Sequence, residues 1–206
     1  MTLQTDYSDR CENCLEPTAR RLERFLKECL DGMPRIDSIS VRAKSPDRFC
    51  KKAEKLLEDG TNKYSDPLNQ IQDQVGARIV CFYLQDVEKV TKVILRYFRP
   101  IEERKVVPDS RYKFGYFGKH YILIFPEDVI DDSYPPRPNV FELQIKTLFQ
   151  HAWSEADHDL RYKPICEMDE DFERRIAFTS AQAWGADQIF NELFMRASDN
   201  GNEQGG

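Results

Sequence analysis

The sequence predicts a domain that combines β-strands with amphipathic helices, and three stretches carry most of that prediction. Residues 140–145 alternate between apolar and polar side chains, the pattern of a half-buried strand. Residues 79–83 form a short apolar run typical of a buried strand. Residues 149–160 place apolar side chains at helical spacing, and Thr147 just before them is a suitable helix cap.

The remaining elements follow from the same two periodicities. Short alternating or apolar stretches predict further strands at 36–41 and 121–125. Apolar residues at helical spacing predict helices at about 17–30, 87–98 and 168–197.

Composition sets the domain boundaries that we expect. Residues 1–16 lack periodicity and predict a flexible N-terminus or a short helix, and the Gly-rich residues 198–206 predict a disordered tail. The domain is therefore expected to span residues 17–197. Residues 102–111 are charged and show neither periodicity, so we expect a mobile connection there.

The overall composition is that of an ordinary globular protein. The chain has 206 residues, of which 40% are hydrophobic and 32% charged. It has neither a signal-peptide pattern nor an apolar run approaching the roughly 20 residues that span a bilayer, so we expect a cytoplasmic protein. The net charge of −6 argues against a broad nucleic-acid surface but is compatible with a local basic pocket. Six scattered cysteines, with one C-x-x-C at Cys11 and Cys14, predict reduced thiols.

A basic segment at residues 42–52 is the first candidate binding element. Ser45 and Pro46 predict a helix start, with Arg42 and Lys44 just before it and the pair 51–52 inside it. Cations that converge on a helix N-terminus suit a polyphosphate. The alternative for this segment alone is a solvated basic surface.

Two carboxylates stand near predicted strands. Asp73 lies just upstream of the apolar run 79–83, on an expected turn that Gly76 relaxes. Glu142 lies on the polar face of the predicted strand at 140–145, together with Gln144 and Lys146. An aspartate at the mouth of a core strand can bind Mg²⁺, although a turn-forming aspartate is the commoner case. The polar strand face can equally be a merely exposed one.

Residues 112–121 combine glycines with aromatic and basic side chains. Such a loop can approach a flat ligand closely and offer stacking faces, or it can be an aromatic hairpin packed on the core.

Taken together, these motifs resemble the RelA/SpoT-type nucleotide pyrophosphokinase domain, the domain that synthesises the alarmone ppGpp. The resemblance covers about Val41 to Lys163, in the family's order and roughly its spacing. The motifs are Arg42-x-Lys44-Ser45-Pro46 followed by Lys51, Asp73-x-x-Gly76-x-Arg78, Gly115-Tyr116-x-x-x-His120, Glu142-x-Gln144-x-x-Thr147, and Trp153 with His158 and Tyr162-Lys163.

The resemblance implies an α+β fold, a mixed β-sheet flanked by helices and similar to nucleotidyltransferases. It implies a single-domain small alarmone synthetase, because neither a hydrolase domain nor a regulatory region accompanies the motifs. The implied reaction transfers the β,γ-pyrophosphate of ATP to the ribose 3′-hydroxyl of GDP or GTP. By the resemblance, Asp73 binds the Mg²⁺ that bridges the ATP phosphates, and Glu142 reaches the same metal or takes the proton of the attacking hydroxyl.

The resemblance also assigns nucleotide-binding residues. Lys44 and Lys51 match cations that bind the triphosphate, while Arg42 and Arg78 match side chains that stack on the adenine. The positions matched to the acceptor nucleotide are Tyr116, His120 and Gln144. Relatives often form homo-oligomers through terminal helices, and we expect the same use of the C-terminal helix.

The sequence departs from the family pattern on the acceptor side, where Phe117 and Gly118 fill the middle of the glycine loop. Elsewhere Arg48 stands at a frequent serine and Lys146 at a frequent arginine. The changed loop leaves the identity of the acceptor open, and two alternative functions remain, of which the second is opposed by the intact Asp73 and Glu142. One is a toxic small synthetase, paired with an antitoxin, that modifies adenine nucleotides or the 3′ end of tRNA. The other is a catalytically silent interaction module. A tRNA acceptor requires a basic surface, for which the available residues are Arg104, Arg111, Lys113 and Lys119.

Overall fold

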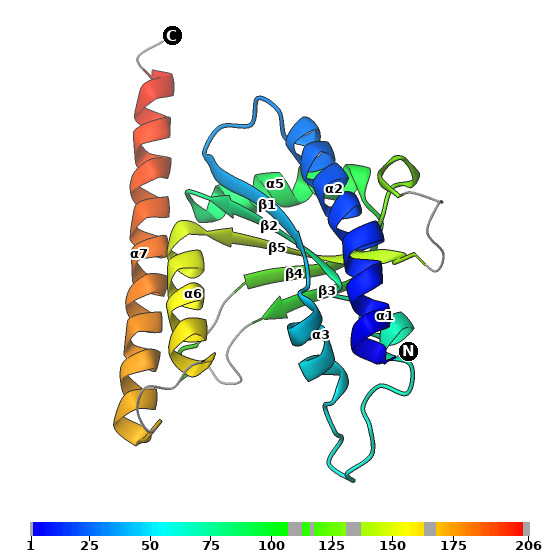
Figure 1. Cartoon of the computed structure of the whole chain (residues 1–206). Coiled ribbons are helices and arrows are strands. Elements are labelled where there is room, and N and C mark those ends of the chain that lie inside the picture. The colour runs from blue at the N-terminus through cyan, green and yellow to red at the C-terminus, as the bar shows by residue number, and fades with distance from the viewer. Residues whose placement is uncertain (1, 107–112, 116–117, 131–136, 163–167, 204–206) are drawn as a thin grey trace.

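The computed structural model describes residues 2–106, 113–115, 118–130, 137–162 and 168–203, and a five-stranded sheet organises it (Figure 1). The sheet order is β1-β2-β5-β4-β3, with β2 and β5 parallel and the other neighbours antiparallel. The predicted mixed sheet flanked by helices is therefore confirmed. The strands are β1 (Ile36–Ala43), β2 (Val75–Cys81), β3 (Pro100–Val106), β4 (Gly118–Ile124) and β5 (Val140–Thr147).

Helices connect and cover these strands. In the part of the chain that the structure describes, no helix has both the length and the apolarity needed to cross a membrane. The helices are α1 (Leu3–Arg10), the π-helical turn η1 (Cys11–Leu15), α2 (Glu16–Cys29), α3 (Pro46–Ala53), α4 (Pro67–Gln70), α5 (Leu84–Tyr97), the 3₁₀ turn η2 (Glu127–Val129), α6 (Leu148–Tyr162) and α7 (Glu170–Glu203).

One face of the sheet carries the hydrophobic core. Phe141, Leu143 and Ile145 of β5 are fully buried on this face, as the alternation in the sequence predicts. The helices α2 and α5 pack over it, and Phe25 of α2 meets Phe98 edge to face at 5.6 Å between ring centroids. Burial of these large side chains supplies the main stabilising term of the fold.

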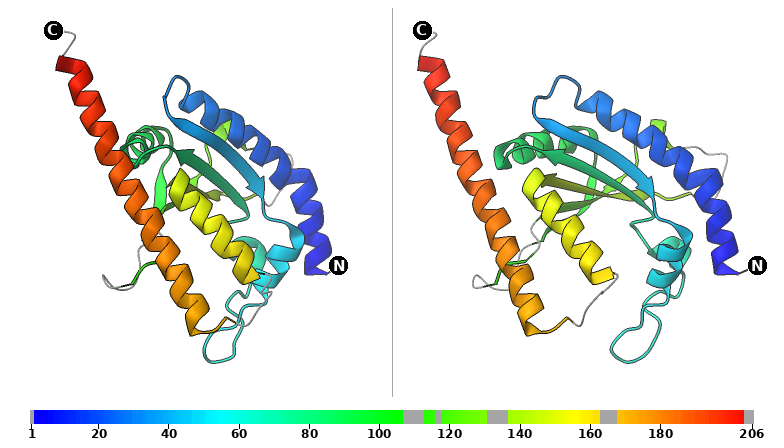
Figure 2. Two further views of the ribbon diagram at one scale, coloured as in Figure 1. Left: turned by 90° about the vertical axis from the view of Figure 1, so that its left-hand side faces the viewer. Right: turned by 60° about the vertical axis from the view of Figure 1, so that its left-hand side comes forward.

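The opposite face of the sheet carries the polar side chains. Figure 2 shows α2 along one side of the sheet and α6 and α7 on the other. Thr147 begins α6 as predicted, since its hydroxyl accepts a hydrogen bond from the Gln150 backbone N–H at 3.1 Å. The polar face is thus bordered by α6 at one end and by α3, which follows β1, at the other (Figure 1).

Of the two alternatives for residues 1–16, the N-terminal residues form helix and not a flexible segment. Residues 3–29 are helical, and Tyr7 is fully buried with its ring stacked on Phe49 at 3.6 Å. Tyr7, Cys11 and Cys14 recur at helical spacing on the buried side. That signal is visible in the sequence only when cysteine is counted as an apolar residue. The five cysteines among the described residues form no disulfide.

Three other predictions on local structure were also wrong. Much of the charged segment expected to be mobile is the edge strand β3, whose Arg104 pairs in register with His120. An edge strand exposes most of its side chains, so its composition resembles that of a loop. Gly76 lies inside β2 rather than in a turn, opposite Glu142. Helix α7 continues to Glu203, beyond the expected start of the disordered tail.

Candidate functional site

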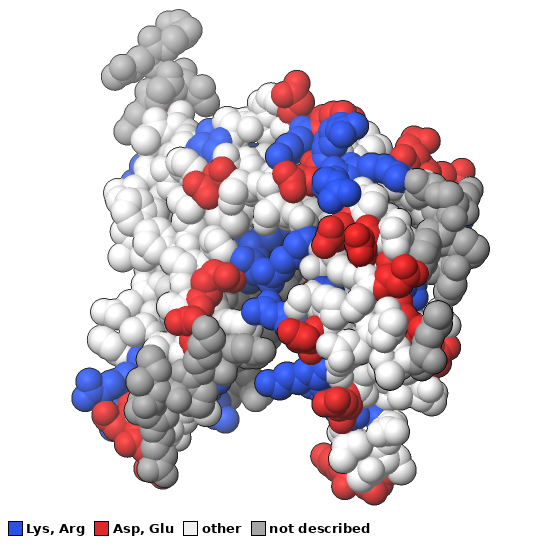
Figure 3. Space-filling view, in the orientation of Figure 1, with Lys and Arg blue, Asp and Glu red and all other residues white. Residues whose placement is uncertain are grey.

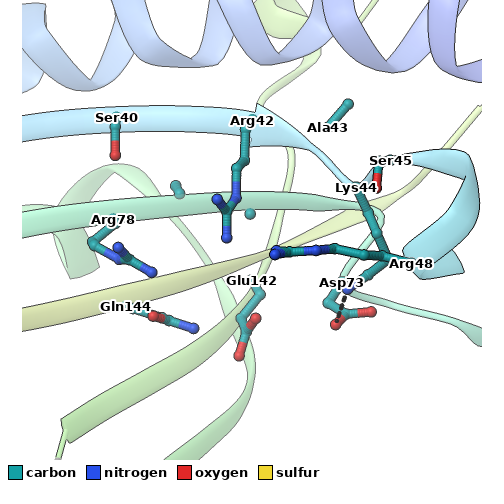
Figure 4. A pocket seen from close by; sticks show the side chains of 12 residues that line it. Ser40, Arg42, Ala43, Lys44, Ser45, Arg48, Asp73, Arg78, Glu142 and Gln144 are labelled. Atoms are coloured by element: carbon teal, nitrogen blue, oxygen red, sulfur yellow. Dashed lines mark ion pairs between the residues drawn. The ribbon is translucent and has the colours of Figure 1, made fainter. Parts of the chain in front are cut away.

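The polar face of the sheet holds a cavity of about 330 Å³ at the meeting of β1, β2 and β5. The strand register aligns Arg42 with Gly76 and Glu142 in one row, and Arg78 with Gln144 in the next. Because alternate residues share a face, both rows project toward the same side. Figure 4 shows these side chains converging on one hollow. The described residues that line it are Ser40, Arg42, Ala43, Lys44, Ser45, Arg48, Asp73, Gly76, Ala77, Arg78, Glu142 and Gln144.

Asp73 is held at one end of this cavity by two lysines. Its Oδ2 lies 3.0 Å from Lys44 Nζ and 2.8 Å from Lys52 Nζ. A backbone hydrogen bond of 2.8 Å from Lys44 to Gln74 joins the end of β1 to this segment. Burial raises the pKa of Asp73, but the two ammonium groups outweigh it and leave the pKa below its usual value. Asp73 Oδ1 is buried without a hydrogen-bond partner among the described residues, so one carboxylate oxygen remains for a ligand.

Helix α3 brings Lys52 to Asp73, whereas Lys51 is exposed. Neither lysine is among the described residues that line the cavity, but Arg48, one helical turn before Lys52, lines it. Adjacent helical residues point about 100° apart, so a shift of one position moves the side chain off this face. The assignment of Lys51 to the triphosphate stays a prediction.

Glu142 occupies the centre of the cavity and is paired with a histidine. Its Oε1 lies 2.9 Å from Nδ1 of His120, which projects from the neighbouring strand β4. Burial raises the pKa of Glu142, but the hydrogen bond and charge of His120 outweigh it and the pKa is lowered. A hydrogen bond from Gln144 acts in the same direction. Glu142 is therefore ionised at neutral pH.

Arg78 is held from α6 by residues that the sequence analysis did not select. Its Nη1 lies 2.8 Å from Glu155 Oε1 and 3.4 Å from His151 Nδ1. The pKa of Glu155 is raised by burial but lowered overall by Arg78, and the pKa of His151 is lowered by burial and by the same arginine. His151 and Glu155 are four residues apart and share one helix face, which the sequence does show. That this face meets Arg78 depends on the tertiary structure.

Lys146 adds a buried cation beside the same face. Its side chain is only 3% exposed, and Nζ donates a 3.1 Å hydrogen bond to Ser154 Oγ on α6. Burial and the nearby Arg78 lower the pKa of Lys146 to about 8. Lys146 is therefore mostly protonated, and so positively charged, at neutral pH.

The predicted site residues divide into three groups. Among the described ones, Lys51 and His120 do not line the cavity, and Lys51 is exposed. Tyr116 lies outside the described residues, as does Phe117 of the altered loop. Those that the structure brings together are Arg42, Lys44, Asp73, Arg78, Glu142 and Gln144, with His120 bonded to Glu142.

The surface charge agrees with this geometry. Figure 3 shows Lys and Arg side chains gathered in the central hollow of this face, with carboxylates around them. A basic pocket inside a protein of net charge −6 concentrates anions locally without attracting them over the whole surface.

The donor set of the cavity fits a divalent cation shared with a ligand. Two ionised carboxylates, Asp73 and Glu142, line it, and Asp73 Oδ1 is buried without a partner among the described residues. No cluster of three or more His, Cys, Asp and Glu occurs among those residues. Mg²⁺ commonly binds through one or two carboxylates and completes its shell with water and phosphate oxygens. The cavity matches that kind of site better than a closed structural metal site.

A mixed sheet that presents paired carboxylates among arginines and lysines defines a class of proteins that bind metal-complexed phosphates. The family described as "Region found in RelA / SpoT proteins" matches residues 41–165, more than half of the chain. This protein therefore belongs to the RelA/SpoT family.

Individual relatives agree with that assignment. The GTP pyrophosphokinase YjbM of Bacillus subtilis (strain 168) is 26% identical over 175 residues, which cover 82% of this chain and 77% of that protein. The crystal structure of the small alarmone synthetase 1 of Bacillus subtilis bound to its product pppGpp has a TM-score of 0.71 and 21% identity, and covers 94% of this chain and 97% of that one. A GTP pyrophosphokinase family protein of Streptococcus pneumoniae has a TM-score of 0.73 and 20% identity, and covers 97% of both chains. These structures share the fold described above.

Proposed function

We propose that this protein is a (p)ppGpp synthetase. It transfers the β,γ-pyrophosphate of ATP to the ribose 3′-hydroxyl of GDP or GTP and releases AMP. The observation that carries the proposal is the cavity itself. In a chain of the RelA/SpoT family, it brings Asp73 and Glu142, both ionised, together with Arg42, Lys44 and Arg78.

The basic side chains divide between the base and the phosphates of ATP. Arg42 and Arg78 lie on adjacent strands, and their guanidinium planes can stack on the two faces of adenine. Lys44 and Lys52 meet at Asp73 at the other end of the cavity, where they can bind the triphosphate. Because these lysines are already fixed by the carboxylate, little conformational entropy is lost when ATP binds.

Asp73 and Glu142 would hold Mg²⁺. When bound, the ion neutralises charge on the transferred pyrophosphate and orients it toward the acceptor. Asp73 contributes its unpartnered oxygen, and Lys44 and Lys52 keep that carboxylate ionised.

Glu142 also lies where a proton acceptor is needed. His120 occupies one of its carboxylate oxygens, which leaves the other for the metal or for the proton of the acceptor hydroxyl. Gln144 and His120 then border the acceptor, and Tyr116 stacks on its base. In this arrangement the enzyme contributes mainly positioning and charge stabilisation, as expected for phosphoryl chemistry.

The described surface favours a nucleotide over tRNA as acceptor. Two of the basic residues that a tRNA site requires are already in ion pairs, Lys119 with Glu88 at 2.6 Å and Arg104 with Glu102. Binding tRNA phosphates there requires that these pairs be broken. A guanine nucleotide needs no such surface.

We further propose that the protein self-associates through α7. Phe178, Ile189 and Leu193 recur on one stripe of this helix and are 64%, 59% and 53% exposed. Exposed apolar stripes of this kind mark protein interfaces. Light scattering coupled to size exclusion tests the proposal: Ile189→Glu is expected to reduce the mass of the particle, and a wild-type monomer would contradict it.

Transfer of label from [γ-³²P]ATP tests the function. With Mg²⁺, label is expected to be transferred to GDP and GTP, and not to added AMP, to other adenine nucleotides or to deacylated tRNA. Asp73→Asn and Glu142→Gln are each expected to abolish transfer at an unchanged melting temperature. Glu102→Gln, a carboxylate on the same sheet face but outside the cavity, is the matched control and should retain activity.

Other outcomes of the transfer assay would contradict the acceptor, the enzymatic activity or the role of a carboxylate. Label found only in tRNA or in adenine nucleotides would show that the acceptor is not GDP or GTP. The absence of label from every acceptor would refute the enzymatic proposal, and near-normal turnover by either carboxylate variant would refute the role of that residue.

A further inference from the structure

A second and larger cavity, of about 730 Å³, lies between the core face of β5, helix α5 and the helices α6 and α7. It is lined by residues of α5, α6 and α7 and of the start of β4, and Figures 1 and 2 show α6 beside α7. Ile145 lines it, whereas its strand neighbour Gln144 lines the catalytic cavity. Since adjacent strand residues point to opposite faces, the two cavities meet β5 from opposite faces, and they share no lining residue.

The wall of this cavity contains a buried carboxylate that is only half satisfied. Asp187 is 3% exposed, and its Oδ2 accepts a 2.7 Å hydrogen bond from Thr147 Oγ1. Its Oδ1 is buried and has no partner among the described residues. Burial raises the pKa of Asp187 to about 6, so the carboxylate is ionised at neutral pH at an energetic cost. Buried polar atoms are nearly always hydrogen-bonded, so this oxygen points to a ligand.

A donor in the same situation lies nearby. Gln85 Nε2 is also buried without a partner among the described residues, and Gln85 lines the same cavity. Its backbone N–H donates a 3.0 Å hydrogen bond to Asn191 Oδ1, one turn along α7 from Asp187. The unsatisfied donor and the unsatisfied acceptor are therefore on neighbouring surfaces of α5 and α7. Together they complement a group that has an acceptor beside an N–H donor.

The remaining walls favour a flat and uncharged molecule. Trp153 and Trp184 line the cavity and offer aromatic faces. Among the described residues that line it, three carboxylates, those of Glu88, Glu103 and Asp187, stand against one ammonium, that of Lys119, which is paired with Glu88. This balance repels phosphate groups. The volume lies within the range of small-molecule pockets.

We propose that this cavity binds a neutral, planar heterocycle with adjacent hydrogen-bond donor and acceptor groups, as in a nucleobase or nucleoside. Asp187 Oδ1 accepts from the ligand N–H, Gln85 Nε2 donates to the ligand acceptor, and the tryptophan rings pack on its faces. This ligand is distinct from the polyphosphate substrates, whose charge suits the basic cavity on the opposite face.

Tryptophan fluorescence provides a direct readout, because both tryptophans of the sequence line this cavity. The full chain is titrated with guanosine, inosine, adenosine and uridine, and separately with GTP and ATP. At least one nucleoside is expected to give a saturable change, and to bind more tightly than its triphosphate does at this site. Gln85→Met keeps the side-chain volume but removes the donor, and is expected to weaken nucleoside binding about tenfold.

Matched variants separate this site from the catalytic one. Gln72→Met makes the same replacement at an exposed position and should bind the nucleoside normally. Gln85→Met should leave the KM for ATP and GDP unchanged, which excludes binding at the acceptor site as the cause. Asp187→Asn, which can keep the Thr147 hydrogen bond, should also weaken nucleoside binding.

Three results would overturn the proposal: no saturable change with any nucleoside, equal affinity of Gln85→Met and wild type, or triphosphates that bind at this site as tightly as nucleosides. The fluorescence readout does not depend on pyrophosphate transfer, so this proposal and the catalytic one can fail separately.

Discussion

Replacement of Lys52 by methionine tests the geometry of the proposed ATP site most sharply. Methionine keeps an unbranched side chain of similar length but removes the charge. Lys52 Nζ lies 2.8 Å from Asp73 Oδ2, and Lys44 Nζ lies 3.0 Å from the same oxygen. Asp73 therefore keeps one ammonium partner in Lys52→Met and remains ionised. The expected loss is confined to the contact with the triphosphate.

The size of that loss follows from the kind of bond. A hydrogen bond to a charged group contributes about 1.5–3 kcal/mol, and each 1.4 kcal/mol corresponds to a factor of about ten. The KM for ATP should therefore rise roughly tenfold to hundredfold. Lys51→Met, one residue earlier on the same helix, should change it by less than about twofold, because exposed charges contribute little.

The assay is the initial rate of AMP formation at increasing ATP and saturating GDP, with melting temperatures as a check on folding. A large KM effect in Lys51→Met together with a normal Lys52→Met would refute the assignment of Lys52. Equal effects in both variants would show that general positive charge, rather than the contact with Asp73, governs ATP binding.

Three further predictions concern other parts of the structure. A Cβ atom added at Gly76 meets no atom within 4 Å, and Gly76 lines the cavity proposed to bind ATP. Gly76→Val should therefore raise the KM for ATP at least roughly tenfold, while the melting temperature stays constant or rises, since glycine weakens a strand. The Tyr7 hydroxyl donates a 3.0 Å hydrogen bond to the Lys44 carbonyl. Tyr7→Phe should therefore lower the free energy of unfolding in urea by about 1 kcal/mol and raise the KM for ATP a few-fold. An unchanged KM would show that Tyr7 does not position Lys44. Asp187 has a folded-state pKa of about 6, above its unfolded value near 3.9, so wild-type stability should fall as the pH rises from 4 to 7 through this group. Asp187→Asn can keep the Thr147 hydrogen bond without the buried charge and should gain about 1–3 kcal/mol at pH 7 and little at pH 4, and equal gains at both pH values would contradict this account.

Much of the fold could be predicted because its elements follow simple periodicities. The alternation of residues 140–145 and the cap at Thr147 correctly predict the strand–helix unit that carries Glu142. The edge strand β3 and the helical residues before α2 could not be predicted in the same way. An edge strand leaves little apolar pattern in its sequence, and the buried side of the N-terminal helices consists partly of cysteines.

The candidate site, too, could be predicted from the sequence only in part. Motif spacing selected Asp73 and Glu142 as candidates because each stands in a short, recognisable segment, and both line the cavity. It could not show that Lys52 meets Asp73, since that contact depends on which side of α3 faces Asp73. Nor did it find Glu155 as the partner of Arg78, because these residues are 77 positions apart in the sequence and meet only through the docking of α6.

The sequence by itself determined the class of fold, the family and the chemical types of the candidate site residues, because these depend on local periodicity and on residues at short, fixed spacing. The tertiary structure decided which cations meet Asp73, that His120 pairs with Glu142, and that Gln85 and Asp187 line a second cavity. Such choices depend on the register of strands and the docking of helices, which bring together residues far apart in the chain.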